Sequence, residues 1–595
     1  MDLIRSHHAE WDIQAGLDRT RGPERRRTFW KGFWNQDSDP SHGKLFQRNL
    51  EGRVSPAGGP LRNCKCGDDM NNANDSNTSD TVAAETRAAS ILESGRNCWR
   101  IERADRLALI VDAADYFVHL RQVLIAAKRE VLLIGWDFDF EIDMLPGETE
   151  TNGLAPDGYP KQLGDFLEAV VENSPELHIY MLKWNGAVIA APGRFLPTMA
   201  LRVFAHERIH FALDGHHPFG ACHHQKIVVA DDSIAFCGGI DATEDRWDTS
   251  EHAPDDARRT RKDGSLYGPW HDATTALTGA AARALAELSR RRWHRATGDE
   301  ITAPDDAPPP VWPDGLPVAL RDVDVGIART EPPYDGAEII NEIELLYLDA
   351  IKAARERIYI ESQYFATESV CAALEERLKE DDGPEVVVIN PESAKSELED
   401  RAMHVLRGRM IRRLRAVDHA GRFRIYHPVN AARVPIYVHA KILIVDDRLL
   451  RIGSSNLNER SMGFDTECDV AFECDEAEAR DTGQVIAGFR ARLLAEHFGA
   501  ASEVVEQLHR DGHSILEIID ELNSDIGRGL VSIEPEKEDW LDGMFADKRL
   551  LDPRYLPGET TSAGQGIRPR HLAVAAAVVG IGFLGWYVWR SRSRT

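Results

Sequence analysis

The spacing His-x-Lys-x4-Asp occurs at two places in this chain, within "HHQKIVVADD" and "VHAKILIVDD". The residues concerned are His224, Lys226, Asp231, His439, Lys441 and Asp446. In each copy an apolar run separates the lysine from the aspartate, as in a buried β-strand. Side chains two positions apart in an extended segment point to the same side, so each copy presents an imidazole and an ammonium group together. We therefore expect the chain to fold as two related halves.

The surroundings of the two copies are duplicated as well. A helical pattern leads into an apolar strand in "DYFVHLRQVLIAAKREVLLIG" and again in "IELLYLDAIKAARERIYIE". With 595 residues the chain can bury two domain cores. We predict an α/β protein of two duplicated halves, each a mixed β-sheet flanked by helices, with the active site at the interface between them.

The predicted boundaries follow changes in composition. Polar runs such as "DDMNNANDSNTSD" lack the apolar periodicity of a folded domain. The proline-rich and acidic stretch "TGDEITAPDDAPPPVWPDGLP" is typical of a surface connection. The predicted segments are a disordered stretch (1–90), the first half (91–317), the second half (318–500), a helical or linker region (501–571) and a transmembrane anchor (572–589).

Charge and cysteine usage narrow the classes of partner. The formal net charge of -27 disfavours attraction to a polyanion, so we expect no nucleic-acid partner. The eight cysteines have neither zinc-site spacing nor the density of a disulfide framework, which indicates a reducing compartment. The first residues carry charges where a secretory signal needs an apolar core, so we expect no signal peptide.

The segment 572–589, "LAVAAAVVGIGFLGWYVW", contains 18 residues without a charge. This is about the length needed to cross a hydrocarbon core of ~30 Å. A buried helix is the alternative, but helices of soluble proteins seldom lack a polar face. We predict a single-pass membrane anchor. Arginines flank both ends, so the orientation is open, with the cytoplasmic side favoured.

The apolar runs are expected to form hairpins that turn on Asp-Asp. If each turn has two residues, His224 lies opposite Gly239 and His439 opposite Ser454. Small residues at these positions leave room for a ligand. The nearby cluster His216, His217, Cys222 and His223 is an alternative metal site, but its spacing fits no standard ligand set and the second half has no counterpart.

Two imidazoles, two ammonium groups and a row of small residues are suited to a phosphate diester. A neutral histidine can attack phosphorus and form a phosphohistidine, while a protonated histidine donates to the departing oxygen. One histidine cannot perform both tasks in the same step, which explains why the motif occurs twice. The lysines supply positive charge, so we expect neither a cofactor nor a metal ion in the reaction.

At these residues the chain resembles the phospholipase D superfamily, whose signature is the paired H-x-K-x4-D motif. The segments "GGIDATEDRWDT", "IYIESQYF" and "GSSNLNERSMGFDTECD" are similar to phosphatidylcholine-type phospholipases D. The resemblance implies a nucleophilic His224 and an acidic His439, although the symmetry of the motifs leaves the reverse assignment open.

The resemblance also implies roles for other residues of the motifs. It implies phosphate contacts by Lys226, Lys441 and Asn456. Gly239 and Ser454 are expected to bind phosphate because they face the histidines in the predicted hairpins. Within the catalytic signature, Asp231 and Asp446 resemble architectural residues at hairpin turns more than bases. Glu467 is a candidate for orienting a histidine, since a carboxylate fixes the imidazole tautomer.

The expected function is that of a phospholipase D, which converts membrane glycerophospholipids to phosphatidic acid with water or an alcohol as acceptor. A cardiolipin-synthase-type phosphatidyltransferase is the first alternative, followed by a nuclease of the same superfamily and an inactive membrane scaffold. Headgroup specificity and oligomeric state are open at this point.

Overall fold

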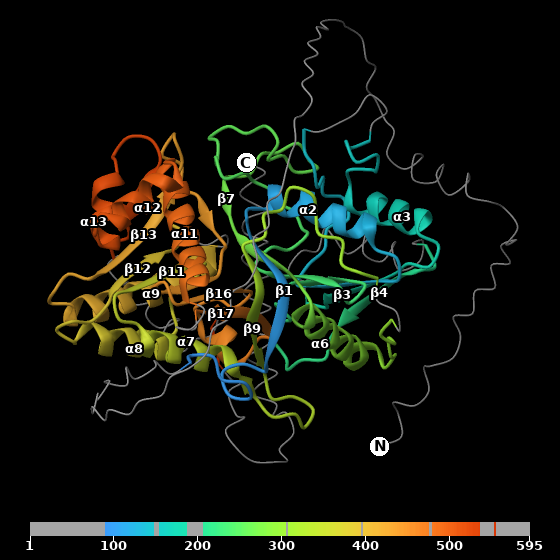
Figure 1. The fold of residues 1–595 in the computed structure, drawn as a ribbon, viewed down its shortest axis with the longest axis horizontal. Coiled ribbons are helices and arrows are strands. Elements are labelled where there is room, and N and C mark those ends of the chain that lie inside the picture. The colour runs from blue at the N-terminus through green and yellow to red at the C-terminus, as the bar shows by residue number, and fades with distance from the viewer. Residues whose placement is uncertain are drawn as a thin grey trace, which may run out of the picture. The chain divides into compact units, whose positions relative to one another are not determined.

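One large mixed β-sheet runs through the part of the chain that the structure, a computed structural model, describes (Figure 1). The described residues are 90–147, 154–186, 206–304, 308–393, 397–474, 479–535 and 552–554. The predicted disordered stretch 1–90 lies outside them except for residue 90. The sheet and its covering helices confirm the predicted mixed α/β fold class.

The strands of the sheet fall into two series with the same order, except that β18 adds an edge strand to the second. The first series runs from the sheet edge inward as β4 (Ile209–Asp214), β3 (His178–Trp184), β2 (Glu130–Gly135), β5 (Ile227–Ala230), β6 (Ile234–Gly238), β8 (Ala273–Thr278) and β1 (Arg100–Val111). The second continues outward as β9 (Leu320–Glu331), β17 (Glu467–Glu473), β16 (Leu449–Gly453), β15 (Ile442–Val445), β11 (Arg357–Glu361), β12 (Glu385–Ile389), β13 (Phe423–Val429) and β18 (Gly529–Ser532). The central strands β1 and β9 pair antiparallel, so the two halves form one continuous sheet.

Short strands complete the pattern. β10 (Ile340–Asn341) pairs with the end of β9. A separate two-stranded sheet joins β7 (Trp270–His271) of the first half to β14 (Tyr437–Val438) of the second. This second sheet joins the residues just before His439 to the segment just before Asp272 of the first half.

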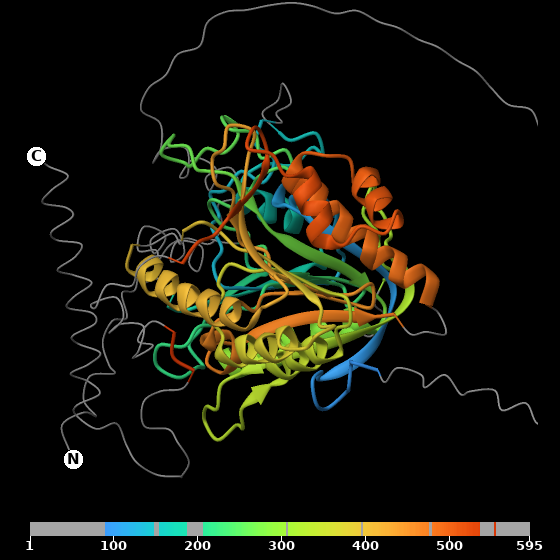
Figure 2. The same ribbon diagram turned by 90° about the vertical axis from the view of Figure 1, so that its left-hand side faces the viewer.

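Helices cover both faces of the large sheet (Figures 1 and 2). The described helices are α2 (Ala113–Ala126), α3 (Leu163–Asn173), α6 (Ala280–Thr297), α7 (Glu342–Ala353), α8 (Glu368–Leu378), α9 (Glu397–Val417), α10 (Glu459–Gly463), α11 (Ala479–Phe498), α12 (Ser502–Arg510) and α13 (Ile515–Leu522). Alternation along β2 shows the two faces: Leu132 and Ile134 pack with α6, whereas Val131 and Leu133 pack with α2 and α3.

The same alternation holds in the second half. Tyr359 of β11 belongs to the apolar cluster that contains residues of α11, α12 and α13, whereas Ile358 and Ile360 pack with α7, α8 and α9. The cluster on the α6 side includes residues of both halves. A shared core on this face therefore fixes the two halves against each other.

The motif hairpins turn differently from the prediction. Ala230 pairs with Ile234, and Val445 pairs with Leu449, so each turn has three residues rather than two. Asp231 and Asp446, the first residues of the two turns, have positive φ angles of 53° and 52°, which aspartate tolerates better than most residues. The predicted facing of His224 with Gly239 and of His439 with Ser454 is therefore wrong by one residue.

The end of the described chain also departs from the predicted boundaries. β18 pairs with β13, so the second half extends beyond residue 500 into the predicted linker region. The predicted anchor 572–589 lies outside the described residues. Within the described ranges, the structure contains no helix with the length and apolar character required to span a bilayer.

Candidate active site

The two motifs meet across the interface between the halves. His224 and Lys226 lie immediately before β5, and His439 and Lys441 immediately before β15. The backbone N–H of His224 donates to the carbonyl of Thr466 in the second half (2.8 Å). The backbone N–H of His439 donates to the carbonyl of His271 in the first half (2.7 Å). Each histidine is therefore held by backbone of the opposite half.

A carboxylate from the second half holds the side chain of His224. Its Nδ1 lies 3.0 Å from Oε2 of Glu467 and 3.0 Å from the carbonyl oxygen of Ser454. Glu467 in turn accepts hydrogen bonds from the hydroxyls of Ser454 (2.6 Å) and Ser461 (2.7 Å). With Nδ1 engaged, Nε2 of His224 is left for chemistry. The structure thus gives Glu467 the contact that an orienting residue requires.

His439 has an equivalent partner in the first half, which the sequence did not reveal. Its Nδ1 lies 2.6 Å from Oδ2 of Asp272. The other carboxylate oxygen of Asp272 accepts a hydrogen bond from the backbone N–H of Ala273 (2.8 Å). The ring of Trp270 lies 5.1 Å from the ring of His439. The imidazole is therefore bounded by the β7 segment and its carboxylate.

The duplication contained a signal for Asp272. Gly453 pairs with Asp469 in the second half, and Gly238 pairs with Thr274 in the first. Glu467 lies two residues before Asp469, and Asp272 lies two residues before Thr274. The two carboxylates thus occupy equivalent positions, but this equivalence depends on strand register, which only the folded chain defines.

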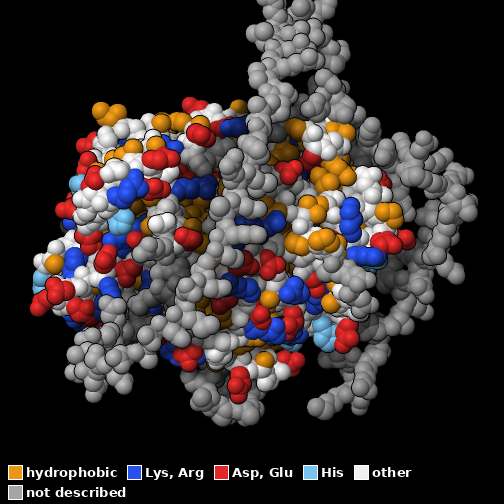
Figure 3. Space-filling view, in the orientation of Figure 1, with side chains coloured by type: hydrophobic (Ala, Val, Ile, Leu, Met, Phe, Trp, Pro, Cys, Tyr) orange, Lys and Arg blue, Asp and Glu red, His pale blue; other side chains and the backbone are white. Residues whose placement is uncertain are grey.

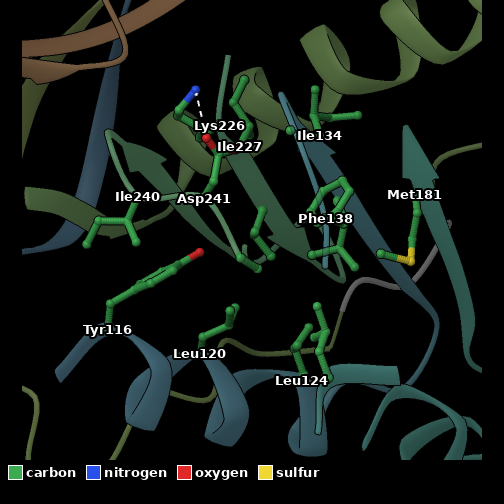
Figure 4. A pocket seen from close by; sticks show the side chains of 15 residues that line it. Tyr116, Leu120, Leu124, Ile134, Phe138, Met181, Lys226, Ile227, Ile240 and Asp241 are labelled. Carbon is green, nitrogen blue, oxygen red and sulfur yellow. Dashed lines mark ion pairs between the residues drawn. The ribbon is translucent and has the colours of Figure 1, made fainter. Parts of the chain in front are cut away.

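The two lysines differ in their partners. Nζ of Lys226 lies 3.1 Å from Oδ2 of Asp241, which Figure 4 marks as an ion pair beside a small apolar cavity. Nζ of each lysine donates to the carbonyl of the histidine two residues before it, that of Lys226 at 2.8 Å. Nζ of Lys441 also lies 3.4 Å from Oε1 of Gln363. Burial lowers the pKa of Lys441 to about 7. Lys226 therefore forms an ion pair with Asp241, whereas Lys441 has no equivalent carboxylate among its contacts with the described residues.

Charges from both halves act on each imidazole. Burial lowers the pKa of His224 well below its usual value, and the charges of Lys226 and Lys441 add to this effect. Burial also lowers the pKa of His439 well below its usual value, with contributions from Lys441, Arg246 and Lys226. Each imidazole senses both ammonium groups, so the four side chains belong to one electrostatic site, in which the uncharged imidazole is favoured.

The carboxylate partners are shifted in the opposite direction. Burial raises the pKa of Glu467 to about 8 and that of Asp272 to about 7. Burial therefore penalises an isolated charge on either partner of each pair. The side chain of His224 keeps 15% of its surface exposed and that of His439 keeps 7%, whereas both carboxylates are fully buried. A ligand can reach the imidazoles but not the groups that orient them.

The residues predicted to contact phosphate have other contacts. A side chain at Gly239 would place Cβ 2.2 Å from Oδ1 of Asp272, so this glycine makes room for the carboxylate. Ser454 binds Glu467 and His224. Both residues thus support the carboxylates, and their phosphate-binding roles stay predictions. Asn456 is buried, and its side-chain oxygen has no hydrogen-bond partner among the described residues, so it keeps capacity for a ligand.

Asp231 and Asp446 lie at the other ends of β5 and β15 from the histidines. The carboxylate of Asp231 accepts hydrogen bonds from three consecutive backbone N–H groups, those of residues 128–130. Asp446 does the same for residues 355–357. The two aspartates therefore fasten each hairpin turn to the start of the neighbouring strand, which supports the architectural character expected of them over a catalytic role.

The histidines that the sequence offered as an alternative metal site make other contacts. Nε2 of His223 lies 3.0 Å from Asp214, and its Nδ1 lies 2.9 Å from the hydroxyl of Thr466. Nε2 of His217 accepts a hydrogen bond from Trp184 (3.1 Å). Within the described ranges these histidines do not form a group of converging ligand atoms.

Comparison with known proteins finds a family model and several relatives that are similar to this chain. A family model described as "Cardiolipin synthase, PLD-like domain" matches residues 347–486. Phospholipase D A of Dictyostelium discoideum is 24% identical over 516 residues, covering 72% of this chain and 38% of the relative. Phospholipase D alpha 4 of Arabidopsis thaliana is 25% identical over 381 residues, covering 47% of this chain and 49% of the relative. The chain thus spans less than half the length of these two proteins.

A solved structure that is similar to this chain is that of a phosphatidylserine synthase from Haemophilus influenzae, with a TM-score of 0.47 and 11% sequence identity. The match covers 70% of this chain and 95% of that chain.

Proposed function

Because the chain belongs to the phospholipase D superfamily, we propose that it is a phospholipase D acting on the headgroup phosphodiester of glycerophospholipids. The products are phosphatidic acid and a free headgroup alcohol when water is the acceptor, or a new phosphatidyl ester when another alcohol is. The observation that carries the proposal is the crossed pairing of His224 with Glu467 and of His439 with Asp272. This pairing supports a single site in which both imidazoles are oriented and each has its Nε2 available for reaction.

The first step forms a bond between one imidazole and phosphorus and breaks the bond between phosphorus and the headgroup oxygen. The attacking imidazole must be uncharged, which the lowered pKa of His224 favours. The other histidine must carry a proton for the leaving oxygen. The negative charge of a bound phosphodiester favours this protonated form, because an opposite charge nearby raises the pKa of an imidazole.

The second step reverses these roles. The histidine that has lost its proton removes a proton from water or an alcohol, and the oxygen of this acceptor attacks phosphorus while the phosphohistidine bond breaks. Lys226 and Lys441 stabilise the negative oxygens in both steps. His224 is proposed as the nucleophile by resemblance, and the reverse assignment predicts the same products.

A phosphatidyltransferase of the cardiolipin-synthase type is the second candidate. It is favoured by the description of the family model that matches residues 347–486. The chemistry is the same, but the acceptor alcohol belongs to a second lipid. A nuclease is less favoured, because the net charge is -27 and basic and acidic side chains are interspersed on the face shown in Figure 3.

The test uses the full-length chain with vesicles of phosphatidylcholine, measuring choline and phosphatidic acid, and with phosphatidylglycerol alone, measuring cardiolipin. We expect choline release by the unmodified chain and none by His224→Ala or His439→Ala. Butanol should divert product to phosphatidylbutanol. Cardiolipin without choline release would favour the second candidate, and neither product from the folded chain would overturn both.

The nucleophile can be identified by trapping. If His224 attacks, His439→Asn should still form the phosphohistidine with substrates that have a good leaving group, but should hydrolyse it slowly. Mass spectrometry of peptides kept at alkaline pH should then find the phosphatidyl group on His224. Its presence on His439 in the matched variant His224→Asn would reverse the assignment.

We further propose that segment 572–589 anchors the enzyme in a membrane with the catalytic halves on the cytoplasmic side. The support is the uncharged length of this segment and the location of phospholipid substrates in bilayers. Deletion of 572–589 should move the chain from the carbonate-resistant membrane fraction to the supernatant. An unchanged distribution would contradict the anchor.

A further inference from the structure

A second group of ionisable side chains lies behind the active site, buried between the two halves. It consists of Asp112, His252 and His271 from the first half and Glu496 from α11. One nitrogen or oxygen atom from each of the four lies within 4.8 Å of the others, and all four residues are buried. The reaction proposed above uses none of them.

The hydrogen bonds of this group are incomplete without a cation. Nε2 of His252 (3.2 Å) and Nδ1 of His271 (2.8 Å) both approach the same oxygen, Oε1 of Glu496. Oδ2 of Asp112 is buried and has no hydrogen-bond partner among the described residues, and Asp112 is only 1% exposed. A buried carboxylate oxygen without a partner is costly, and it is placed where a metal ligand would be.

The second nitrogen of each imidazole is held by a further carboxylate. Nδ1 of His252 lies 2.9 Å from Oδ2 of Asp248, and Nε2 of His271 lies 2.8 Å from Oε2 of Glu361. Histidines that bind metals almost always donate their other ring N–H in this way, which fixes the ring and leaves the ligating nitrogen unprotonated. Both imidazoles of the group are therefore oriented with their free nitrogens toward Asp112 and Glu496.

The balance of charge also favours a cation. Four buried carboxylates, those of Asp112, Asp248, Glu361 and Glu496, surround the two imidazoles. The guanidinium in direct contact with this set is that of Arg259, whose Nη1 lies 3.0 Å from Asp248. Two imidazolium protons or one divalent ion could compensate the excess. Protonated imidazoles would lie near Asp112, with Nε2 of His252 3.8 Å from Oδ2 and Nδ1 of His271 3.4 Å from Oδ1. The first distance exceeds that of a hydrogen bond, whereas a metal ion would bind Oδ2 directly.

The backbone of Asp112 adopts a strained conformation. Its angles, φ 66° and ψ 152°, fall in a region that is essentially reserved for glycine. Its side chain does not cap α2, so helix capping does not account for an aspartate here. A ligand that binds the carboxylate gives a reason for an aspartate at a position suited to glycine.

We propose that Asp112, His252, His271 and Glu496 bind a divalent transition-metal ion, with Zn²⁺ preferred, in a closed structural site. Two nitrogen and two oxygen ligands without an open position suit four-coordinate zinc. The ion joins the two halves next to the active site, since Asp112 accepts a hydrogen bond from the backbone of Asp272 (3.3 Å). Its role is to fix this interface rather than to activate water or substrate.

The test measures metal in the full-length chain purified after growth with added zinc, by elemental mass spectrometry and a chromogenic zinc assay. We expect about one zinc per chain, a fall in melting temperature on removal with a strong chelator, and recovery on adding zinc back. Zinc below about 0.1 equivalents, with no uptake on titration, would overturn the proposal. Stoichiometric manganese or iron would overturn the preference for zinc.

Two variants address the ligands directly. Asp112→Gly removes a ligand while suiting the backbone angles, so the chain should fold and lose most of its zinc. Glu496→Gln should lose zinc as well, and His513→Gln, which changes a histidine outside the group, should keep it. Full zinc content in folded Asp112→Gly and Glu496→Gln would place the metal elsewhere and overturn the proposal. The readout is metal content, so it does not depend on lipid hydrolysis.

Discussion

Oδ2 of Asp272 lies 2.6 Å from Nδ1 of His439, although 167 residues separate them in the chain. Asp272 belongs to the first half and His439 to the second. In the other pair, His224 belongs to the first half and Glu467 to the second, and Nδ1 of His224 lies 3.0 Å from Oε2 of Glu467. Each half thus supplies an imidazole for one pair and a carboxylate for the other. Neither half contains a complete pair, so the proposed reaction depends on the interface as much as on the motifs.

Asp272→Asn tests the carboxylate that the sequence did not reveal. The amide carries no negative charge, so it no longer stabilises the protonated imidazole that His439 needs in order to donate to the leaving oxygen. We expect kcat to fall by about 10² to 10⁴, with KM changed little because Asp272 is fully buried. Steady-state kinetics on phosphatidylcholine vesicles give both constants.

The matched variant Glu467→Gln should lower kcat similarly, and Asp272→Glu should recover part of the activity if its carboxylate reaches Nδ1. A rise in KM with unchanged kcat in Asp272→Asn would contradict an orienting role. Circular dichroism and melting temperature separate this effect from loss of the fold.

Gly239→Ala should reproduce the defect of Asp272→Asn without changing the carboxylate. The added methyl group would lie 2.2 Å from Oδ1 of Asp272, which forces the carboxylate away from His439. We expect kcat to fall by at least about 10-fold, since small displacements of a reacting group are costly. Gly268→Ala is the control, because its added Cβ meets no atom within 4 Å. Equal activity in the two variants would contradict this account of Gly239.

The sequence predicted the site well where the chemistry follows from residue type and spacing. The repeated motif identified both histidines and both lysines, and the duplicated helix and strand patterns predicted a mixed α/β fold. Glu467 could be proposed because an imidazole requires a partner and the resemblance offered one.

The sequence predicted less where the answer depends on register. A turn of three residues in place of two shifted the expected facing of His224 and His439 by one position. Asp272 lies far from both motifs in the sequence, and only the pairing of β6 with β8 shows that it is equivalent to Glu467. The group around Asp112 was not predicted, because its ligands come from four separate segments that become neighbours only in the folded chain.

Asp231 variants test whether the aspartate of the motif is architectural. Asp231→Asn keeps one acceptor oxygen and tolerates a φ of 53°, whereas Asp231→Ala leaves three backbone N–H groups without their partner. We expect the free energy of unfolding to fall by about 1 to 2 kcal/mol in the first and by more in the second. Urea unfolding measures the loss. The kcat of the folded protein should stay within about twofold, and a large loss of kcat at unchanged stability would make the residue catalytic.

The pKa of His224 can be followed directly by NMR of ¹³C-labelled histidine. Burial and the charges of Lys226 and Lys441 lower this pKa, so the imidazole should stay uncharged as the pH falls below about 6.5, the usual value. The nucleophilic form then persists in mild acid, and the acid limb of kcat/KM should lie below that pH if this histidine controls it. Lys226→Met removes one positive charge and should raise the pKa, which moves the titration to higher pH. A wild-type titration at or above 6.5, or a downward shift in Lys226→Met, would show that the two lysines do not act on His224 as the geometry indicates.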